Sequence, residues 1–321
     1  MTLTGDEMKS AVWLADTSVF YKASSPRNIS RIKITGARVV TSVSSIFEIL
    51  SGMLKADEFQ LRKNALRAIF EICGVEGIFL LEPDGKIAEA FGVRSEPLPR
   101  PNIEAALAIG MCAESPADIT KIYRDKNMNT IIQLEPAALT GWDQKTGEEF
   151  QRQISENYRK PSPWLKGIAN HLGYGGKEGT EFAKQAMAAL IKSPAYRTSA
   201  FCGLAHRAGV IEANEIDAAL ADTSLIEMDK LAARARKSYN GSLEGYLDIY
   251  LEYCAYCAVK NRTAGKNDLL DLEPMVYFEK AQEHFSYVSG EKLWAGLDLE
   301  DGAIVRRCFG DRSIYVDEVL R

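Results

Sequence analysis

The sequence lacks any apolar run of the roughly 18 residues that a membrane-spanning helix requires. Its first segment, MTLTGDEMKSAVWLA, has no basic region followed by an apolar stretch and a small-residue cleavage site, as a secretion signal would. We therefore expect a cytoplasmic protein without membrane contact.

The sequence also lacks a basic surplus, because it has 39 Lys and Arg residues and 44 Asp and Glu residues. The net charge of −5 does not indicate a nucleic-acid partner, but a metal in an acidic pocket still presents a positive face to phosphate.

Cysteine is scarce, with six residues scattered over a chain of 321. This spacing is poor for a disulfide framework and suits a reducing compartment. Only Cys254 and Cys257 have the spacing of a metal-binding pair, and neither a second such pair nor a histidine pair lies near them. The surrounding YLDIYLEYCAYCAVK has helical periodicity. We expect these two cysteines to pack in a helical core rather than to bind zinc.

The first part of the chain alternates strand and helix patterns. Strands are expected at 11–16, 37–43 and 77–82, and helices at 44–54, 58–74 and 85–92. Alternation of this kind predicts an α/β fold with a parallel sheet that is covered by helices.

The proline-rich SEPLPRP at 95–101 interrupts this alternation. Helical patterns follow, and further strands are expected only at 285–294 and 313–319. We therefore predict an α/β domain in two parts, 11–95 and 245–321, split by a mainly helical insertion at 96–244. The helices expected beyond the prolines cover 103–114, 146–158, 179–192, 200–211, 215–238 and 243–262.

Five carboxylates stand at the ends of apolar segments or interrupt them. Asp16 ends the first strand, Glu48 lies in SIFEIL after the second, Asp268 and Asp271 share NDLLD, and Glu291 follows YVS. Loops at the carboxyl ends of parallel strands meet at one edge of the sheet, so these acids can converge. Clustered carboxylates repel one another unless a cation lies between them. An oxygen-only set of ligands suits Mg²⁺ or Mn²⁺.

Each acid also has a simpler interpretation. Asp16 can cap the helix that follows it, the two acids of NDLLD can begin a helix, and Glu291 can be an ordinary surface residue. Glu48 is harder to explain in this way, because apolar residues flank it on both sides and an unpaired buried carboxylate is costly. The order of the acids along the chain favours the metal site.

Four segments in this order resemble the signature blocks of PIN-domain nucleases. They are WLADTSVF, RVVTSVSSIFEIL, NDLLDLEPMVYF and FSYVSGEKLW, within residues 11–95 and about 245–321. The resemblance implies that Asp16, Glu48 and Asp268 bind the metal and that Asp271 is the second acid of the family's Asp-x-x-Asp motif.

The same resemblance assigns two hydroxyl groups and a fifth acid. Ser18 matches the hydroxyl near the first acid, and Ser289 stands where the family has threonine in its last turn. Glu291 replaces the usual aspartate, and its extra methylene group shifts the carboxylate.

The resemblance implies a PIN-like three-layer fold and metal-dependent hydrolysis of phosphodiester bonds, mostly in RNA. Bound Mg²⁺ or Mn²⁺ would activate water and stabilise the charge on the phosphate, so no nucleophilic side chain is needed. One alternative is a catalytically weak module that binds RNA or a protein, which the replacement at Glu291 favours. Another is a DNA-directed nuclease of the flap-nuclease type, for which more acids are expected. The sequence leaves the oligomeric state open.

The helical insertion offers a surface for RNA. Residues 152–207 include nine basic residues against three glutamates, an excess of six, with aromatic residues between them. Aromatic rings stack on unpaired bases. We expect the densest RNA contact around PSPW, from Arg159, Lys160, Trp164 and Lys166. A solvated helical face with buried aromatic residues explains the same pattern.

Overall fold

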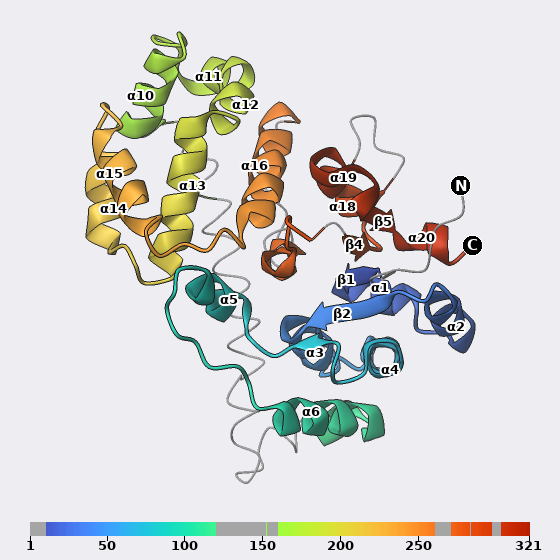
Figure 1. Cartoon of the computed structure of the whole chain (residues 1–321). Helices are drawn as coiled ribbons and strands as arrows, with labels where there is room; N and C mark the ends of the chain where they lie inside the picture. Colours follow the sequence, from blue (N-terminus) through green and yellow to red (C-terminus); the bar gives the residue numbers. More distant parts are fainter. Residues whose placement is uncertain (1–10, 120–151, 153–159, 261–270, 283, 297–302) are drawn as a thin grey trace, which may run out of the picture. The chain divides into compact units, whose positions relative to one another are not determined.

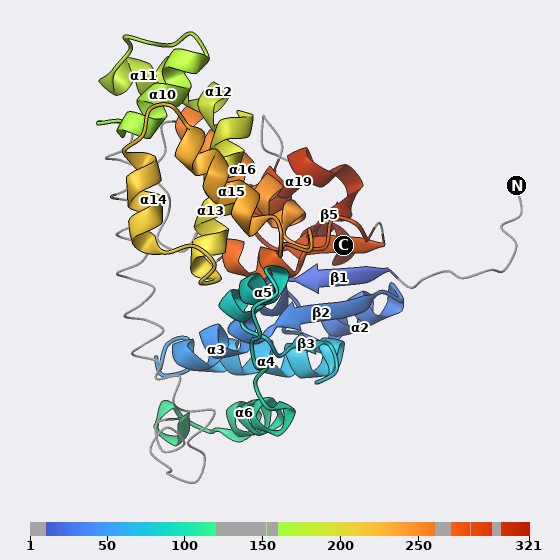
Figure 2. The ribbon, with the colours of Figure 1, turned by 60° about the vertical axis from the view of Figure 1, so that its left-hand side comes forward.

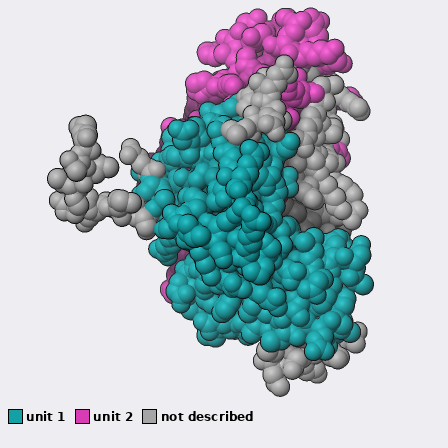
Figure 3. Space-filling view, turned by 90° about the vertical axis from the view of Figure 1, so that its right-hand side faces the viewer, with its two compact units in different colours: residues 1–80, 98–136, 280–321 teal, residues 81–97, 137–279 magenta. Residues whose placement is uncertain are grey.

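The computed structural model describes residues 11–119, 152, 160–260, 271–282, 284–296 and 303–321. The chain divides into two compact units, which are coloured teal and magenta in Figure 3. Unit 1 comprises residues 1–80, 98–136 and 280–321, and unit 2 comprises residues 81–97 and 137–279. Within the described ranges, no helix is long and apolar enough to cross a membrane.

Unit 1 is built on a parallel sheet. In the described part it has five strands in the order β3-β2-β1-β4-β5, of which Figure 1 labels β2, β1, β4 and β5 and Figure 2 labels β3. Val12 of β1 lies opposite Arg38 of β2 and Phe285 of β4. Strands β2 and β3 follow one another on one side of β1, and β4 and β5 follow one another on its other side. The strands are β1 Val12–Ala15, β2 Arg38–Ser42, β3 Ile78–Phe79, β4 Phe285–Ser289 and β5 Ser313–Tyr315.

Burial along the strands shows that both faces of the sheet are covered. Residues 39–42 of β2 and 287–289 of β4 are buried in succession, although neighbouring side chains point to opposite faces. The α/β class and the central parallel sheet that the sequence predicted are confirmed. The helices of unit 1 are α1 Thr17–Lys22, α2 Pro26–Ile34, α3 Val43–Gly52, α4 Phe59–Cys73, α6 Arg100–Cys112, α18 Lys292–Ala295, α19 Ile304–Phe309 and α20 Val316–Val319, with the 3-10 helix η3 Gly310–Arg312.

Unit 2 is helical in its described part. Figure 2 shows α13 beside α15 and α16, and α13 packs on both. Cys254 and Cys257 are buried in α16, in agreement with the core packing expected for them. The elements of unit 2 are α5 Pro83–Ala90, α10 Pro163–His171, α11 Gly179–Gln185, α12 Met187–Ile191, α13 Pro194–Arg207, α14 Ala213–Leu220, α15 Ile226–Ala235, α16 Glu244–Val259 and the 3-10 helix η2 Glu273–Tyr277.

The division into units differs from the boundaries predicted at 95 and 245. Helix α5 and residues 245–279 belong to unit 2, whereas α6 belongs to unit 1. Helix α6 packs closely on α3 and α4 at Gly110, where a Cβ atom would lie 2.8 Å from side-chain atoms of Leu50 and Leu66. Helix α16 packs instead on α12, α13 and η2. Packing partners that are distant in the sequence therefore set the boundaries.

Some elements differ from the predicted pattern. Helix α2 was not predicted, although Ser25 caps it by accepting a hydrogen bond from the Asn28 amide and Pro26 begins it. The single helix expected at 215–238 is two helices, α14 and α15, and the residue between them, Leu225, has a φ of 66°. The strand expected at 285–294 ends at Ser289, where a turn leads into α18.

Candidate active site

Asp16 lies where the order of the strands reverses. It directly follows β1, and β1 pairs with β2 on one side and with β4 on the other. In open parallel sheets, the crevice at the carboxyl ends of the strands beside such a reversal is the usual place for a ligand. The Asp16 residue is only 5% exposed. A buried carboxylate therefore occupies the part of the sheet where the topology predicts a site.

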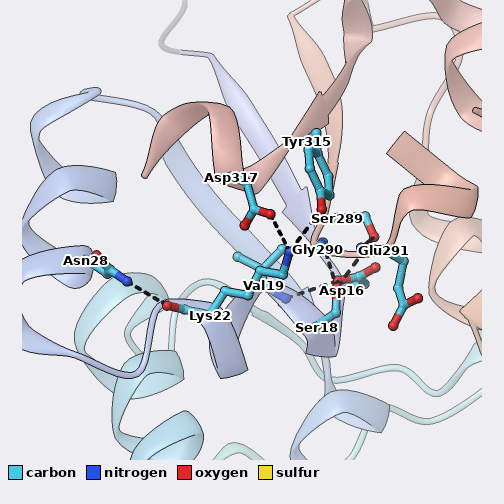
Figure 4. A network of polar contacts seen from close by, with 10 residues as sticks. All are labelled: Asp16, Ser18, Val19, Lys22, Asn28, Ser289, Gly290, Glu291, Tyr315 and Asp317. Carbon is cyan, nitrogen blue, oxygen red and sulfur yellow. Dashed lines mark hydrogen bonds and ion pairs between the residues drawn. The ribbon is translucent and has the colours of Figure 1, made fainter. Parts of the chain in front are cut away.

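Four groups donate hydrogen bonds to the Asp16 carboxylate or approach it closely enough to lower its pKa. Oδ1 accepts from the Val19 amide at 3.2 Å and from the Ser18 hydroxyl (Figure 4). Oδ2 accepts from the Tyr287 hydroxyl at 3.0 Å. Burial raises the pKa of Asp16, and the bonds from Ser18, Ser289, Tyr287 and Val19 only partly offset this effect. Asp16 thus caps α1, as the simpler interpretation has it, and it also carries a charge that is costly to bury.

Ser18 and Ser289 connect the start of α1 to the turn after β4. The Ser18 hydroxyl accepts a hydrogen bond from the Gly290 amide at 2.7 Å and lies 3.5 Å from the Ser289 hydroxyl. The Ser289 hydroxyl accepts from the Glu291 amide at 2.9 Å. Both serines therefore lie beside Asp16, and their role in a metal site stays a prediction.

Glu48 lies beside the residue that follows Asp16. Its Oε2 accepts a hydrogen bond from the Thr17 hydroxyl at 2.6 Å, and its Oε1 lies 3.9 Å from an Arg62 guanidinium nitrogen. The sequence indicated a buried carboxylate here, and this is wrong, because the Glu48 side chain is 47% exposed. Its apolar neighbours are buried, but α3 turns by about 100° per residue and presents Glu48 on its outer side.

The other three predicted acids are Asp268, Asp271 and Glu291. Asp268 lies outside the described residues, and Asp271 belongs to unit 2, just before η2, whereas Asp16 and Glu48 belong to unit 1. Glu291 is exposed, and its side chain extends away from Asp16 (Figure 4). Within the part of the chain that the structure describes, no three Asp, Glu, His or Cys side chains form a group that could hold a metal ion. A common site for all five acids stays a prediction.

The sequence did not reveal three residues around Asp16. Thr17 holds Glu48, Tyr287 bonds to Asp16, and Lys22 lies beside Gly290. Thr17 stands in the WLADTSVF segment as a hydroxyl residue after Asp16, but its bond to Glu48 was not predicted. Nothing local marks Tyr287 or Lys22, since their partners come from distant parts of the chain.

The residues expected to bind RNA lie differently from the prediction. Trp164 is only 3% exposed and packs in α10 with its ring centroid 5.9 Å from that of Tyr196. It therefore offers no free face for stacking on a base, and its predicted role is wrong. Lys160 is exposed, Lys166 pairs with Glu178 at 3.0 Å, and Arg159 lies outside the described residues.

The positive charge of the helical insertion is smaller in the structure than the residue count for 152–207 indicates. Among the described residues of this stretch, four basic side chains pair with acids, and most of these acids come from outside residues 152–207. The count along the chain therefore overestimated the local positive charge. The pairs are Lys166 with Glu178, Lys192 with Glu252, Arg197 with Glu244 and Asp248, and Arg207 with Asp84 and Glu273.

Comparisons of the chain with protein-family models, with curated proteins and with solved structures gave no match. The residues around Asp16 and the resemblance of the four sequence blocks are therefore the features that bear on function.

Proposed function

We propose that the chain is a metal-dependent nuclease that hydrolyses RNA at a site formed around Asp16 and Glu48. The observation that carries the proposal is the buried Asp16 carboxylate at the reversal of strand order. Glu48 supports it, because its carboxylate accepts a hydrogen bond from the hydroxyl of Thr17, the residue that follows Asp16 in the chain. The order of the PIN-like sequence blocks supplies the reaction class.

The residues around Asp16 fit a hard divalent cation. Asp16 and Glu48 offer carboxylate oxygens, which Mg²⁺ and Mn²⁺ prefer. Burial raises the pKa of Asp16, and a cation beside it would stabilise the ionised form. Such an ion, when bound, activates water and stabilises negative charge on a phosphate. Asp268, Asp271 and Glu291 are the further ligands that the resemblance implies.

The surrounding side chains have positioning roles in this proposal. Ser18 and Tyr287 fix both oxygens of Asp16, and Ser18 also bonds to the Gly290 amide after β4. Thr17 orients Glu48. Pre-formed hydrogen bonds of this kind hold ligands in place before substrate binds, so less reorganisation is needed during the reaction.

A second candidate function is a catalytically weak module that binds RNA or a protein. The observation that favours it is the exposed Glu291 side chain, which extends away from Asp16 in Figure 4. A site that lacks this ligand would bind a metal ion less tightly and cut slowly.

A cleavage assay separates these functions. We expect the purified chain to cut total RNA with Mg²⁺ or Mn²⁺ and to stop when EDTA removes the ion, because the reaction depends on the bound metal. Single-stranded DNA serves as the comparison substrate. Preferential cutting of DNA would support the flap-nuclease alternative, and RNA binding without cutting would support the weak module.

A salt titration tests whether RNA is bound by the insertion. Replacing Arg159, Lys160 and Lys166 together with Gln should weaken RNA binding and lower the slope of log affinity against log salt by up to about two units, at ~0.7 per phosphate. The exposed pair of Lys166 with Glu178 does not prevent this, since such pairs are weak. Single-turnover cleavage at saturating RNA should change little. An unchanged slope would assign the basic stretch to the solvated surface.

A further inference from the structure

Lys22 places a positive charge at the same edge of the sheet as Asp16. It is the last residue of α1, the helix that Asp16 caps. Its side chain runs beside Gly290, where an added Cβ atom would lie 3.1 Å from the Lys22 Cδ and Cε atoms and 2.9 Å from the Ser18 hydroxyl. Gly290 therefore leaves the space through which the lysine side chain passes. The same glycine donates its amide proton to Ser18, which in turn bonds to Asp16.

The Lys22 ammonium group contacts two residues near the C-terminus, Tyr315 and Asp317. It donates hydrogen bonds to Asp317 Oδ2 at 2.7 Å and to the Tyr315 hydroxyl at 3.2 Å, and it lies 4.7 Å from the centre of the Tyr315 ring (Figure 4). Tyr315 ends β5 and lies opposite Ser289 of β4, so these contacts are at the carboxyl edge of the sheet. The ammonium group thus lies among the residues that follow β1, β4 and β5.

The pair of Lys22 with Asp317 is accessible to a competing anion. The two side chains are 32% and 39% exposed. Ion pairs with this exposure contribute little to stability, because water screens them. A phosphate group presents the same kind of acceptor oxygens as a carboxylate and binds ammonium groups through charge-assisted hydrogen bonds. A phosphate near Asp16 can therefore replace the Asp317 carboxylate without a large cost.

We propose that Lys22 binds a backbone phosphate of the RNA substrate and that Asp317 occupies this position when no substrate is present. The proposal rests on the proposed nuclease function and adds a substrate contact to it. Tyr315 supports the ammonium group with its ring and hydroxyl, so the lysine is kept at the edge of the sheet in both states. Asp317 then limits RNA affinity, because RNA has to displace a carboxylate.

Binding of a short single-stranded RNA of mixed sequence, measured in EDTA over a range of salt concentrations, tests this contact. Lys22→Gln should raise the dissociation constant about tenfold, the loss of one charge-assisted hydrogen bond, and should lower the salt slope by about 0.7. Asp317→Asn should have the opposite effect and tighten binding. Lys22→Arg should restore binding, since arginine also binds phosphate.

The matched control is Lys33→Gln on α2, which removes one exposed positive charge from the same unit. It should change the dissociation constant much less than Lys22→Gln. The gain from Asp317→Asn should also shrink in the Lys22→Gln background, because the two side chains act on the same phosphate. An unchanged affinity in Lys22→Gln, an equal gain from Asp317→Asn in both backgrounds, or no binding by the parent protein would overturn the proposal. If Lys22→Gln weakens binding but the parent cuts no RNA with Mg²⁺ or Mn²⁺, the nuclease function fails while the phosphate contact stands.

Discussion

Replacing Asp16 with Asn should abolish most metal-dependent cleavage and, at the same time, stabilise the metal-free protein. The loss of cleavage follows from the loss of a ligand charge at constant volume. The gain in stability follows from burial, which raises the pKa of Asp16 and so makes its ionised form costly in the folded state. Opposite effects on activity and stability are typical of residues that are kept for function.

The substitution can preserve the hydrogen bonds around residue 16. The asparagine oxygen can accept from the Val19 amide and the Ser18 hydroxyl, as Oδ1 of Asp16 does. Its amide nitrogen can donate to the Tyr287 hydroxyl, which accepts instead of donating. The variant therefore removes a buried charge and keeps a hydrogen-bond partner for Val19, Ser18 and Tyr287 at residue 16.

The pH dependence of this gain has a defined sign. With a raised pKa in the folded state, Asp16 lowers the free energy of unfolding as the pH rises from about 3.9, its ordinary value, through the folded pKa. Asn does not titrate, so the two proteins should be similar in acid and diverge toward neutral pH. Thermal unfolding should show a midpoint a few degrees higher for the variant, since about 1 kcal/mol corresponds to ~2–4 °C in a domain of this order of size.

Asp57→Asn is the matched control, because Asp57 is an exposed acid of the same unit. This control should leave cleavage and the midpoint unchanged. Mn²⁺ should raise the unfolding midpoint of the parent and of the control, because an ion that binds the folded protein stabilises it. It should not raise the midpoint of the Asp16 variant, which lacks a ligand for the ion. Cleavage by the Asp16 variant at the parent rate would place the nuclease activity elsewhere or attribute it to a contaminant.

The sheet could be predicted from the sequence because its strands are local patterns. VWLA, RVV and SIY are short apolar or β-branched segments with helical patterns between them, and each became a strand. The unit boundaries could not be predicted in this way. Helix α16 reads as a long buried helix, but only its packing on α12, α13 and η2 assigns it to unit 2. No local pattern contains that choice of partner.

The candidate site was predictable only where a local pattern marks it. Asp16 could be predicted because the end of a strand and a helix-capping signal coincide at this residue. Glu48 was expected at the site, but its burial was predicted wrongly. A run of apolar residues in the sequence does not show which side chain of the helix faces solvent. Lys22 and Tyr287 could not be found, since their hydrogen bonds to Asp317 and Asp16 join residues 295 and 271 positions apart. Trp164 was misjudged because an aromatic residue among basic residues can equally belong to the core.

In unit 2, Arg207→Met should cause a large loss of stability. The Arg207 guanidinium on α13 donates hydrogen bonds to Asp84 of α5 and to both oxygens of Glu273 at the start of η2. Glu273 is buried, so removing the guanidinium leaves a carboxylate without its charge partner. Breaking a buried pair on one side costs about 3–5 kcal/mol, because the remaining charge is not compensated. Urea denaturation of the full chain measures this loss.

The dependence on pH and a second substitution identify the cause. Burial raises the pKa of Glu273 even with Arg207 beside it, and without Arg207 the pKa should rise further. A raised pKa means that stability is lost as the pH rises, so the Arg207→Met variant should be least stable at neutral pH. It should recover as the pH falls below about 4.3, the ordinary pKa of glutamate, because Glu273 is then protonated in both states. Glu273→Gln should restore much of the stability in the Arg207→Met background, because it removes the unpaired charge. Arg234→Met, which breaks an exposed pair with Glu215, should cost much less stability than Arg207→Met, because water screens exposed pairs. A loss in Arg207→Met that neither acid nor Glu273→Gln relieves would instead assign the effect to lost packing of the arginine side chain.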